Sequence, residues 1–127
     1  MAYKILIVDD SKLARMYVER ALKVLHPDYV RVEAGSADEA ILHMKSEKPD
    51  IALVDINMPG KDGLTLASEL LALNPQMPLA IVSANNQDEI IEQTRVLGVA
   101  FLAKPLTERT LSAFLADATR QIKESTG

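Results

Sequence analysis

The chain has 127 residues, enough for one domain with a hydrophobic core, and its 48% hydrophobic and 25% charged content is ordinary for a globular protein. The formal net charge of −4 argues against broad binding to nucleic acids or anionic membranes, which favours basic surfaces. The absence of cysteine excludes disulfides, thiol nucleophiles and Cys-ligated zinc, and two histidines are too few for a His-rich metal site.

The first residues lead directly into a short apolar run, Ile5–Val8. A signal peptide needs a longer apolar stretch followed by small residues, and a membrane span needs about 20 apolar residues. Neither pattern is present, and no repeat, low-complexity stretch or interdomain linker interrupts the chain. We therefore expect a cytoplasmic protein with a single domain over residues 1–127 and no output domain in this chain.

Short β-rich runs alternate with amphipathic segments along the chain. Most of the runs are continuously apolar, as expected for strands that are covered on both faces. The second run mixes charged with β-branched residues, which is typical of a strand at the edge of a sheet. The predicted strands are Ile5–Val8, Tyr29–Ala34, Ile51–Val54, Leu79–Val82 and Val99–Ala103.

The segments between these runs carry helix signals. Asp62 is a suitable N-cap for a helix over Gly63–Leu73, which ends before a proline. Further helix starts are predicted by two capping-box pairs, Ser36 with Glu39 and Asn86 with Glu89. The last helix places apolar residues on one face, and this stripe is read as core: Leu111, Phe114, Leu115, Ala118 and Ile122.

Successive strand–helix units predict an α/β fold with a parallel sheet, helices on both faces and right-handed crossovers. The usual arrangement for a chain of this size is the flavodoxin-like, doubly wound (βα)5 fold with strand order 2-1-3-4-5. Such folds bind ligands outside the carboxyl ends of their strands.

Polar residues follow four of the predicted strands at this ligand-binding edge. They are Asp9-Asp10, Asp55, Ser83 and Lys104-Pro105. A single Asp after a strand is a common loop or cap residue, and Asp9 with Asp10 is also suited to cap a helix that begins near Ser11. Taken singly, Ser83 and Lys104 are equally ordinary surface residues. Their joint placement is much harder to explain by turn chemistry.

Three carboxylates in one crevice repel each other unless a cation or a proton relieves the repulsion. Mg²⁺ prefers oxygen ligands and typically takes one or two carboxylates, water and a phosphate oxygen. Asp9, Asp10 and Asp55 supply carboxylates, and the backbone carbonyl of Asn57 supplies another oxygen. The sequence therefore predicts a site for Mg²⁺, with Mn²⁺ as an alternative.

This arrangement also suits phosphoryl transfer. One carboxylate can act as the nucleophile and form an aspartyl phosphate. The transferring group spreads negative charge over its oxygens, so catalysis depends on positioning and electrostatics. Lys104 offers a positive charge to one oxygen, and the Ser83 hydroxyl can donate a hydrogen bond to another.

Four segments resemble response regulator receiver domains, which have the CheY-like fold, in order and spacing over essentially the whole chain. They are ILIVDDS (residues 5–11), LVDINMPG (53–60), IVSA (81–84) and FLAKP (101–105). The resemblance implies that Asp55 is the phosphoacceptor and that Asp9 and Asp10 bind Mg²⁺ with the Asn57 carbonyl. It also implies a signalling protein that catalyses only its own phosphorylation and dephosphorylation.

The resemblance assigns the remaining roles. Ser83 is the switch hydroxyl, where many members have Thr, and Lys104 contacts the phosphate. The bond from Lys104 to Pro105 is expected to be cis. Phe101 occupies the position of the switch aromatic residue, often Tyr, although it also suits an ordinary strand core position.

Asn57 and Asn85 lie two positions after Asp55 and Ser83, where the family tunes dephosphorylation. We therefore expect both side chains to affect the lifetime of the acyl phosphate. The expected donor is a sensor histidine kinase, a phosphotransfer protein or a small molecule such as acetyl phosphate.

The surface that switches for an output partner, an output domain or dimerisation is expected to comprise Asn86–Leu97, Val99–Ala103 and Thr107–Ile122. A polar tail, Lys123–Gly127, is expected after the last helix. No direct nucleic-acid binding or membrane insertion is expected.

Three other readings fit less well. A Mg-dependent aspartyl-phosphate phosphohydrolase ordinarily has a second acid two residues after the nucleophile, and here that residue is Asn57. A calcium-binding loop starting at Asp55 needs Asp or Asn at its fifth position and Glu at its twelfth, whereas Pro59 and Leu66 stand there. Glycine-rich nucleotide-binding motifs are absent. Neither His26 nor His43 lies at the carboxyl end of a strand, so they are predicted to be a loop and a helix-surface residue and not catalytic.

Overall fold

The computed structural model describes residues 2–58, 60–84 and 88–126. Within these ranges strands and helices alternate, as the sequence predicts. The elements are β1 (Lys4–Val8), α1 (Lys12–Leu25), β2 (Val30–Ala34), α2 (Ala37–Ser46), β3 (Ile51–Asp55), α3 (Gly63–Leu73), β4 (Leu79–Ser83), α4 (Asp88–Leu97), β5 (Ala100–Ala103) and α5 (Glu108–Thr126). The predicted cap Asn86 and the predicted site residue Asn85 lie outside the described residues.

The five strands form one parallel sheet in the order β2-β1-β3-β4-β5, which confirms the predicted flavodoxin-like topology. The inner strands β3 and β4 are buried along their whole length, in agreement with their apolar sequences. The charged strand β2 lies at one edge, as predicted, and β5 lies at the other. The polar residues predicted after four strands therefore share one end of the sheet. Asp55 and Ser83 are the last residues of β3 and β4, whereas Asp9 and Lys104 follow β1 and β5.

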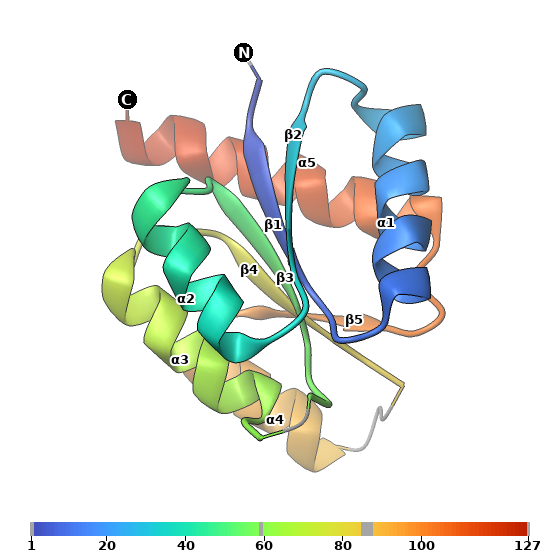
Figure 1. The fold of residues 1–127 in the computed structure, drawn as a ribbon. Helices are drawn as coiled ribbons and strands as arrows, with labels where there is room; N and C mark the ends of the chain where they lie inside the picture. Colours follow the sequence, from blue (N-terminus) through green and yellow to red (C-terminus); the bar gives the residue numbers. More distant parts are fainter. Residues whose placement is uncertain (1, 59, 85–87, 127) are drawn as a thin grey trace.

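Helices cover both faces of the sheet (Figure 1). On one face α1 and α5 pack over a core that includes Ile7, Leu53 and Leu115. On the other face α2, α3 and α4 pack over a core that includes Leu6, Leu66 and Ile81. The alternation of neighbouring strand residues between the two cores is the period of two expected for a strand. The predicted apolar stripe of α5 is confirmed, since all of its members contribute to the first core.

Side-chain caps begin the helices where the sequence predicts them. The Asp62 carboxylate accepts a hydrogen bond from the Thr65 amide at 2.9 Å, and the Ser36 hydroxyl accepts one from the Glu39 amide at 3.2 Å. The Ser36 cap differs from a standard capping box in the partner of the Glu39 carboxylate. The Glu39 carboxylate accepts from the amide of Gly35, one residue before the cap.

The last helix is longer than predicted. The prediction of a polar tail after Ile122 is wrong as far as Thr126, because α5 continues to that residue. Polar residues need not end a helix, and Lys123 in the last turn interacts favourably with the negative end of the helix dipole. The Ser125 hydroxyl also donates to the carbonyl of Gln121 at 2.9 Å.

Three strand starts also differ from the prediction by one residue, because β1 begins at Lys4, β2 at Val30 and β5 at Ala100. Tyr29 is nevertheless buried, and its ring stacks on His26 with the centroids 4.3 Å apart. This stacking contact gives His26 a structural role. It closes the turn between α1 and β2, at the end of the sheet opposite the polar strand ends.

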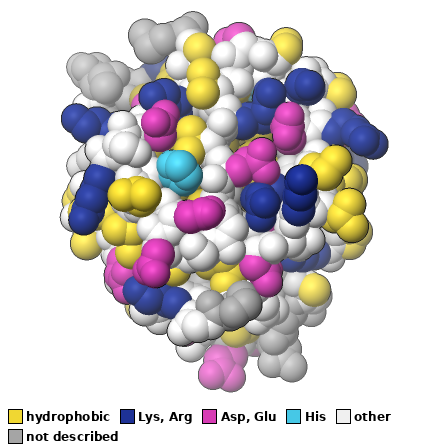
Figure 2. Space-filling view, in the orientation of Figure 1, with side chains coloured by type: hydrophobic (Ala, Val, Ile, Leu, Met, Phe, Trp, Pro, Cys, Tyr) yellow, Lys and Arg dark blue, Asp and Glu magenta, His cyan; other side chains and the backbone are white. Residues whose placement is uncertain are grey.

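Charged side chains of both signs are interspersed on the face in Figure 2, with no broad basic patch on that face. Among the described residues, no helix is long and apolar enough to cross a membrane.

Candidate functional site

Strand register brings the polar residues of four strands to the same level. Val8 is paired with Val54, so the residues that follow them, Asp9 and Asp55, come side by side. On the other side of β3, Asp55 is paired with Val82, the residue before Ser83. Ser83 is paired in turn with Ala103, the residue before Lys104. The predicted convergence at the carboxyl ends of the strands is confirmed.

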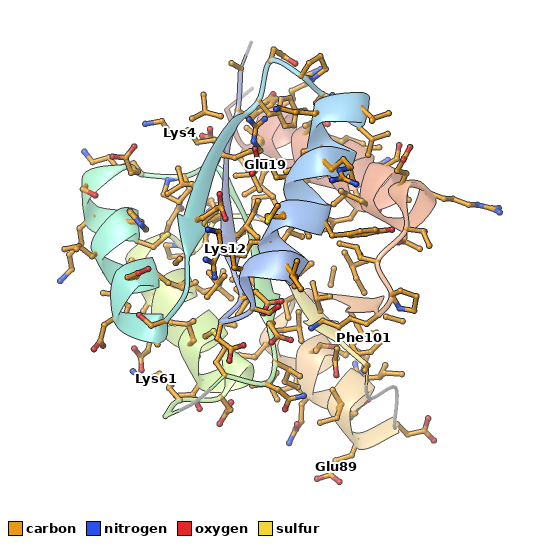
Figure 3. The ribbon with its side chains drawn as sticks, turned by 45° about the vertical axis from the view of Figure 1, so that its right-hand side comes forward. Lys4, Lys12, Glu19, Lys61, Glu89 and Phe101 are labelled. Atoms are coloured by element: carbon orange, nitrogen blue, oxygen red, sulfur yellow. The ribbon has the colours of Figure 1, made fainter. Side chains whose placement is uncertain are left out.

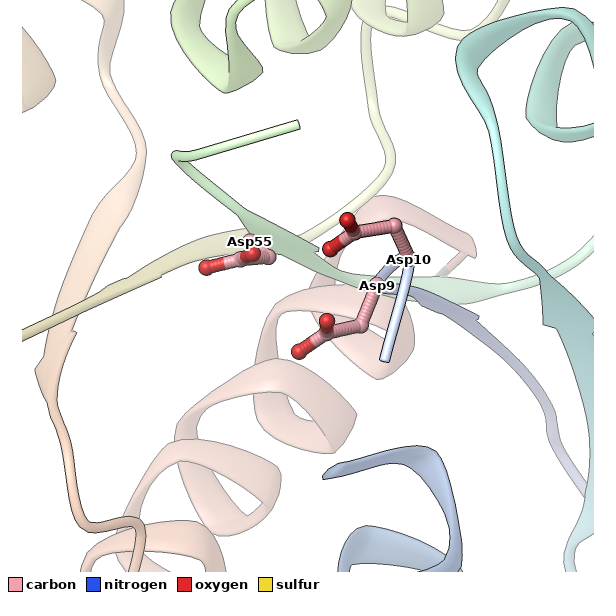
Figure 4. Close-up of side chains that lie close together, drawn as sticks. All are labelled: Asp9, Asp10 and Asp55. Carbon is pink, nitrogen blue, oxygen red and sulfur yellow. The ribbon is translucent and has the colours of Figure 1, made fainter. Parts of the chain in front are cut away.

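Three carboxylates form the centre of the site (Figure 4). Asp9, Asp10 and Asp55 each offer an oxygen, and these oxygens all lie within 4.8 Å of one another. Asp9 and Asp55 are buried, with 8% and 5% of their surface exposed, whereas Asp10 is exposed. The cluster therefore has a buried base and one side that is open to solvent.

Asp9 is held in place by hydrogen bonds to three neighbouring residues. Its amide donates to the carbonyl of Ala34 at the end of β2, and one carboxylate oxygen accepts from the Ser11 amide at 2.9 Å. Its carbonyl accepts from Arg15 of α1 at 2.6 Å. Arg15 was not among the predicted site residues, because an arginine on an amphipathic helix ordinarily faces solvent.

Lys104 supplies the positive charge of the site. Its Nζ lies 3.0 Å from Asp55 Oδ1 and 3.6 Å from Asp9 Oδ2. The backbone amide of Lys104 donates to the carbonyl of Ser83 at 2.9 Å, so the end of β5 is tied to the end of β4. The Lys104–Pro105 peptide bond is cis, as the resemblance implies.

Ser83, Asn57 and Phe101 lie around this centre in different environments. Ser83 is completely buried, whereas Asn57 is exposed just after the end of β3. The Asn57 backbone amide lies close enough to the Asp55 carboxylate to lower the pKa of that carboxyl. Phe101 is half-buried on the edge strand β5 (Figure 3) and pairs in register with Ile81. Its ring is therefore neither fully buried nor fully exposed.

The surroundings shift the ionisation of two site residues. Burial raises the pKa of the Asp55 carboxyl, and the charge of Asp9 raises it further, while Lys104 and the Asn57 amide only partly offset this. Burial by itself lowers the pKa of Lys104, but the hydrogen bond to Asp55 and the charges of Asp55 and Asp9 outweigh it, so the pKa of Lys104 is raised. An added cation would favour the ionised form of Asp55.

A glycine allows the backbone around Asp55 to pack closely against α3. A Cβ atom at Gly63 would lie 2.4 Å from the Asp55 carbonyl oxygen and 2.6 Å from the Ile56 Cα. Both distances are too short for any side chain. The Gly63 amide also donates to the Ile56 carbonyl at 2.8 Å. The first residue of α3 is thus part of the support of Asp55, which the sequence did not reveal.

An apolar pocket of about 420 Å³ opens beside the carboxylates, between α1 and the segment after β5. Its wall includes Tyr17 and Val18 of α1 and Leu106, and Asp55 and Lys104 lie at its polar end. The charged centre thus adjoins an apolar surface, which increases the electrostatic interactions between its groups.

The donor set fits a hard divalent cation. Carboxylate oxygens without sulfur or imidazole are the ligands that Mg²⁺ prefers, and the exposed side of the cluster leaves room for water and a phosphate oxygen. No histidine belongs to this cluster among the described residues.

Comparison with known sequences identifies one family over most of the chain. The family described as "Response regulator receiver domain" matches residues 5–116. The chemotaxis protein CheY of Bacillus subtilis is 33% identical over 115 residues, which cover 89% of this chain and 95% of that protein.

Two further comparisons agree. The positive alginate biosynthesis regulatory protein of Pseudomonas aeruginosa is 37% identical over 123 residues, which cover 91% of this chain but 47% of that protein. The chain thus spans about half the length of this relative. A CheY-like response regulator receiver domain protein from Methanospirillum hungatei superimposes with a TM-score of 0.87 at 26% identity, over 98% of this chain and 99% of that one.

Proposed function

The chain belongs to the response regulator receiver domain family, and from that premise we propose that it accepts a phosphoryl group on Asp55. The observation that carries the proposal is the placement of Asp55. Its carboxylate lies beside those of Asp9 and Asp10 and 3.0 Å from the ammonium of Lys104, at the solvent-open end of the sheet.

In the proposed reaction a carboxylate oxygen of Asp55 attacks the phosphorus of the donor. A P–O bond forms as the P–N bond of a phosphohistidine, or the P–O bond of an acyl phosphate, breaks. The leaving group keeps the electron pair of that bond and takes a proton from solvent when its basicity requires one. The unphosphorylated state is restored when water attacks the acyl phosphate and releases inorganic phosphate.

The residues around Asp55 have separate tasks in this proposal. Lys104 pairs with an oxygen of the transferred group, and Ser83 donates a hydrogen bond to another after its loop shifts. Asp9, Asp10, Asp55 and the Asn57 carbonyl would hold Mg²⁺, or Mn²⁺ in its place. The ion supplies positive charge that offsets the charge of the carboxylates and the phosphoryl oxygens.

The switching surface proposed for the output comprises α4, β5 and α5. Phosphorylation adds about −1.5 to −2 charges next to Lys104 and Ser83, at the ends of β5 and β4. The edge position of β5 and the half-buried state of Phe101 support this choice, because a half-buried ring on an edge strand can become more buried or more exposed. Partner binding or dimerisation would then read the new surface.

The proposed donor is a sensor histidine kinase or a phosphotransfer protein, in the cytoplasm. Leu13, Met16 and Tyr17 are exposed on α1, and Tyr17 also lines the pocket beside Asp55. Such apolar side chains next to the acceptor offer contact area to a protein donor. Receiver domains pass the signal to output domains or partners. We also propose that this chain acts on such a partner and that residues 1–127 form a single domain.

The test is the intact mass of the protein after incubation with acetyl phosphate and Mg²⁺. We expect one added phosphoryl group, which is absent from Asp55→Asn and absent when EDTA removes the metal. A labelled Asp55→Asn variant would place the acceptor on another residue. If the wild-type protein gains no mass, binding of fluoroberyllate with Mg²⁺ separates slow chemistry from an inactive site, and failure of both contradicts the proposed function.

A further inference from the structure

Arg15 lies in the first turn of α1, yet only 17% of its side chain is exposed. Its guanidinium makes two directed hydrogen bonds. Nη1 donates to the backbone carbonyl of Asp9 at 2.6 Å, and Nε donates to Glu33 Oε1 on β2 at 3.0 Å. A flexible arginine on a helix surface is rarely held in this way, because fixing it costs side-chain entropy.

The turn between β2 and α2 is shaped to receive the guanidinium. A Cβ atom at Gly35 would lie 3.3 Å from Arg15 Nη1, so a side chain at this position would press on the arginine. The Gly35 amide is itself held by the Glu39 carboxylate at 3.0 Å. The Arg15 side chain therefore extends from α1 to the end of β2 and the start of α2.

The carbonyl that Arg15 holds belongs to the peptide unit that joins Asp9 to Asp10. This unit is planar and rigid, so fixing its oxygen also fixes the rotation of the backbone on both sides. The Asp9 amide is already tied to Ala34, and its carboxylate to the Ser11 amide. With Arg15 in place, the direction in which both acidic side chains leave the backbone is determined.

We propose that Arg15, anchored by Glu33, is a positioning residue that orients Asp9 and Asp10 for the metal ion. The inference rests on the proposed function, because it assumes that these carboxylates bind Mg²⁺. Groups outside the ligand set that orient ligands commonly change metal affinity by about 10–100-fold when they are removed. Arg15 acts on the ligands through the backbone and does not contact the reacting atoms.

A purely structural ion pair makes a different prediction. A partly exposed pair such as Arg15 with Glu33 contributes little to stability, and its loss would not change metal affinity. Metal affinity, measured separately from the free energy of unfolding, therefore distinguishes the two roles.

The test is titration calorimetry of the whole chain with Mg²⁺ alone. We expect the Kd of Arg15→Gln to rise about tenfold. Arg20→Gln is the matched control, because it removes the same charge from an exposed position of the same helix, and its Kd is expected to stay within about twofold of wild type. Arg15→Lys should recover part of the affinity, because one ammonium can donate to the Asp9 carbonyl but lacks the planar fork that also reaches Glu33.

Glu33→Ala tests the anchor and does not depend on the folding of an Arg15 variant. It should weaken Mg²⁺ binding in the wild-type background and have no further effect in Arg15→Gln. Phosphorylation by acetyl phosphate should be slower in Arg15→Gln at low Mg²⁺ and return to within about twofold of wild type at saturating Mg²⁺, since orientation affects affinity.

An unchanged Mg²⁺ affinity in both Arg15→Gln and Glu33→Ala, beside a wild type that binds the ion, would overturn the role of Arg15 and leave the proposed function standing. A wild-type protein that does not bind Mg²⁺ would overturn both.

Discussion

The ammonium of Lys104 lies 3.0 Å from a carboxylate oxygen of Asp55, so the proposed acceptor is paired before any phosphoryl group arrives. The same ammonium is 3.6 Å from Asp9. One lysine therefore faces two buried carboxylates, and the pKa of Asp55 is still raised, chiefly by burial. The site is short of positive charge, which is the condition that a divalent cation relieves.

The first prediction concerns the stability of the metal-free protein. Between the ordinary pKa of Asp55 in the unfolded chain and its raised pKa in the folded chain, the folded state binds more protons. The free energy of unfolding therefore decreases as the pH rises through this window. Asp55→Asn should abolish this decrease and raise the free energy of unfolding at neutral pH by about 0.5–2 kcal/mol.

Urea unfolding in EDTA at several pH values measures this effect. Asp38→Asn is a suitable control, because this exposed residue in the first turn of α2 interacts favourably with the helix dipole. Its replacement should slightly lower the stability. Equal or lower stability of Asp55→Asn at neutral pH would contradict the prediction.

The second prediction concerns metal binding by Asp10. Because Asp10 is exposed, Asp10→Asn should leave the metal-free stability within about 0.5 kcal/mol of wild type. Its Mg²⁺ affinity should fall by at least about tenfold, since a carboxylate ligand is lost. Titration calorimetry gives the affinity, and urea unfolding with added Mg²⁺ gives an independent value through the extra stability of the bound state. Asp28→Asn, far from the cluster, should bind Mg²⁺ as the wild type does.

The third prediction concerns Lys104. Lys104→Met should slow phosphorylation by acetyl phosphate by roughly 10–100-fold, because the transferred group loses a charged hydrogen-bond donor. The same change should raise the pKa of Asp55 further, since the paired charge is gone. Intact mass as a function of time measures the rate. Lys12→Met, at the exposed start of α1 (Figure 3), has the same change in charge and should react at nearly the wild-type rate.

The fourth prediction separates close packing from backbone strain at two glycines. Gly63→Ala should lower the free energy of unfolding by about 1–3 kcal/mol, because its Cβ would clash with the backbone of Asp55 and Ile56. Gly60→Ala should cost about 1–2 kcal/mol for a different reason, a left-handed φ of 86° with open space around it.

Asparagine tolerates the left-handed region better than alanine does. Gly60→Asn should therefore be more stable than Gly60→Ala, whereas Gly63→Asn should be no better than Gly63→Ala. Urea unfolding of the four variants decides the matter. A stable Gly63→Ala with normal Mg²⁺ affinity would show that the end of β3 has more room than the structure indicates.

The fifth prediction concerns dephosphorylation. The Asn57 side chain is exposed just beyond Asp55, where it can orient or exclude the attacking water. Asn57→Ala should change the lifetime of the acyl phosphate, and the same expectation applies to Asn85. Loss of the phosphoryl mass after removal of the donor measures the lifetime. Asn74→Ala, at the end of α3, should decay like the wild type, and identical decay in all variants would argue against a tuning role.

Much of the fold could be predicted because its signals are local. Apolar runs of strand length, caps such as Asp62, and the polar residues after four of the predicted strands can all be recognised from neighbouring positions of the chain. Because parallel strands all run in the same direction, their carboxyl ends lie at one edge of the sheet, so Asp9, Asp55, Ser83 and Lys104 could be expected together. The local signals were weakest at element ends, as at Tyr29 and in the last turn of α5.

The type of site could be predicted from residue types and strand order alone: the hard oxygen donors, the positive charge of Lys104 and the edge of the sheet where they meet. The contacts that hold the site in place became apparent only from the packing of the elements. The hydrogen bond of Arg15 to the Asp9 carbonyl, the contact of Gly63 with the backbone of Asp55 and the burial that raises the pKa of Asp55 against the charge of Lys104 all depend on distant elements. Such contacts depend on distances of a few ångströms between packed elements, which no local pattern specifies.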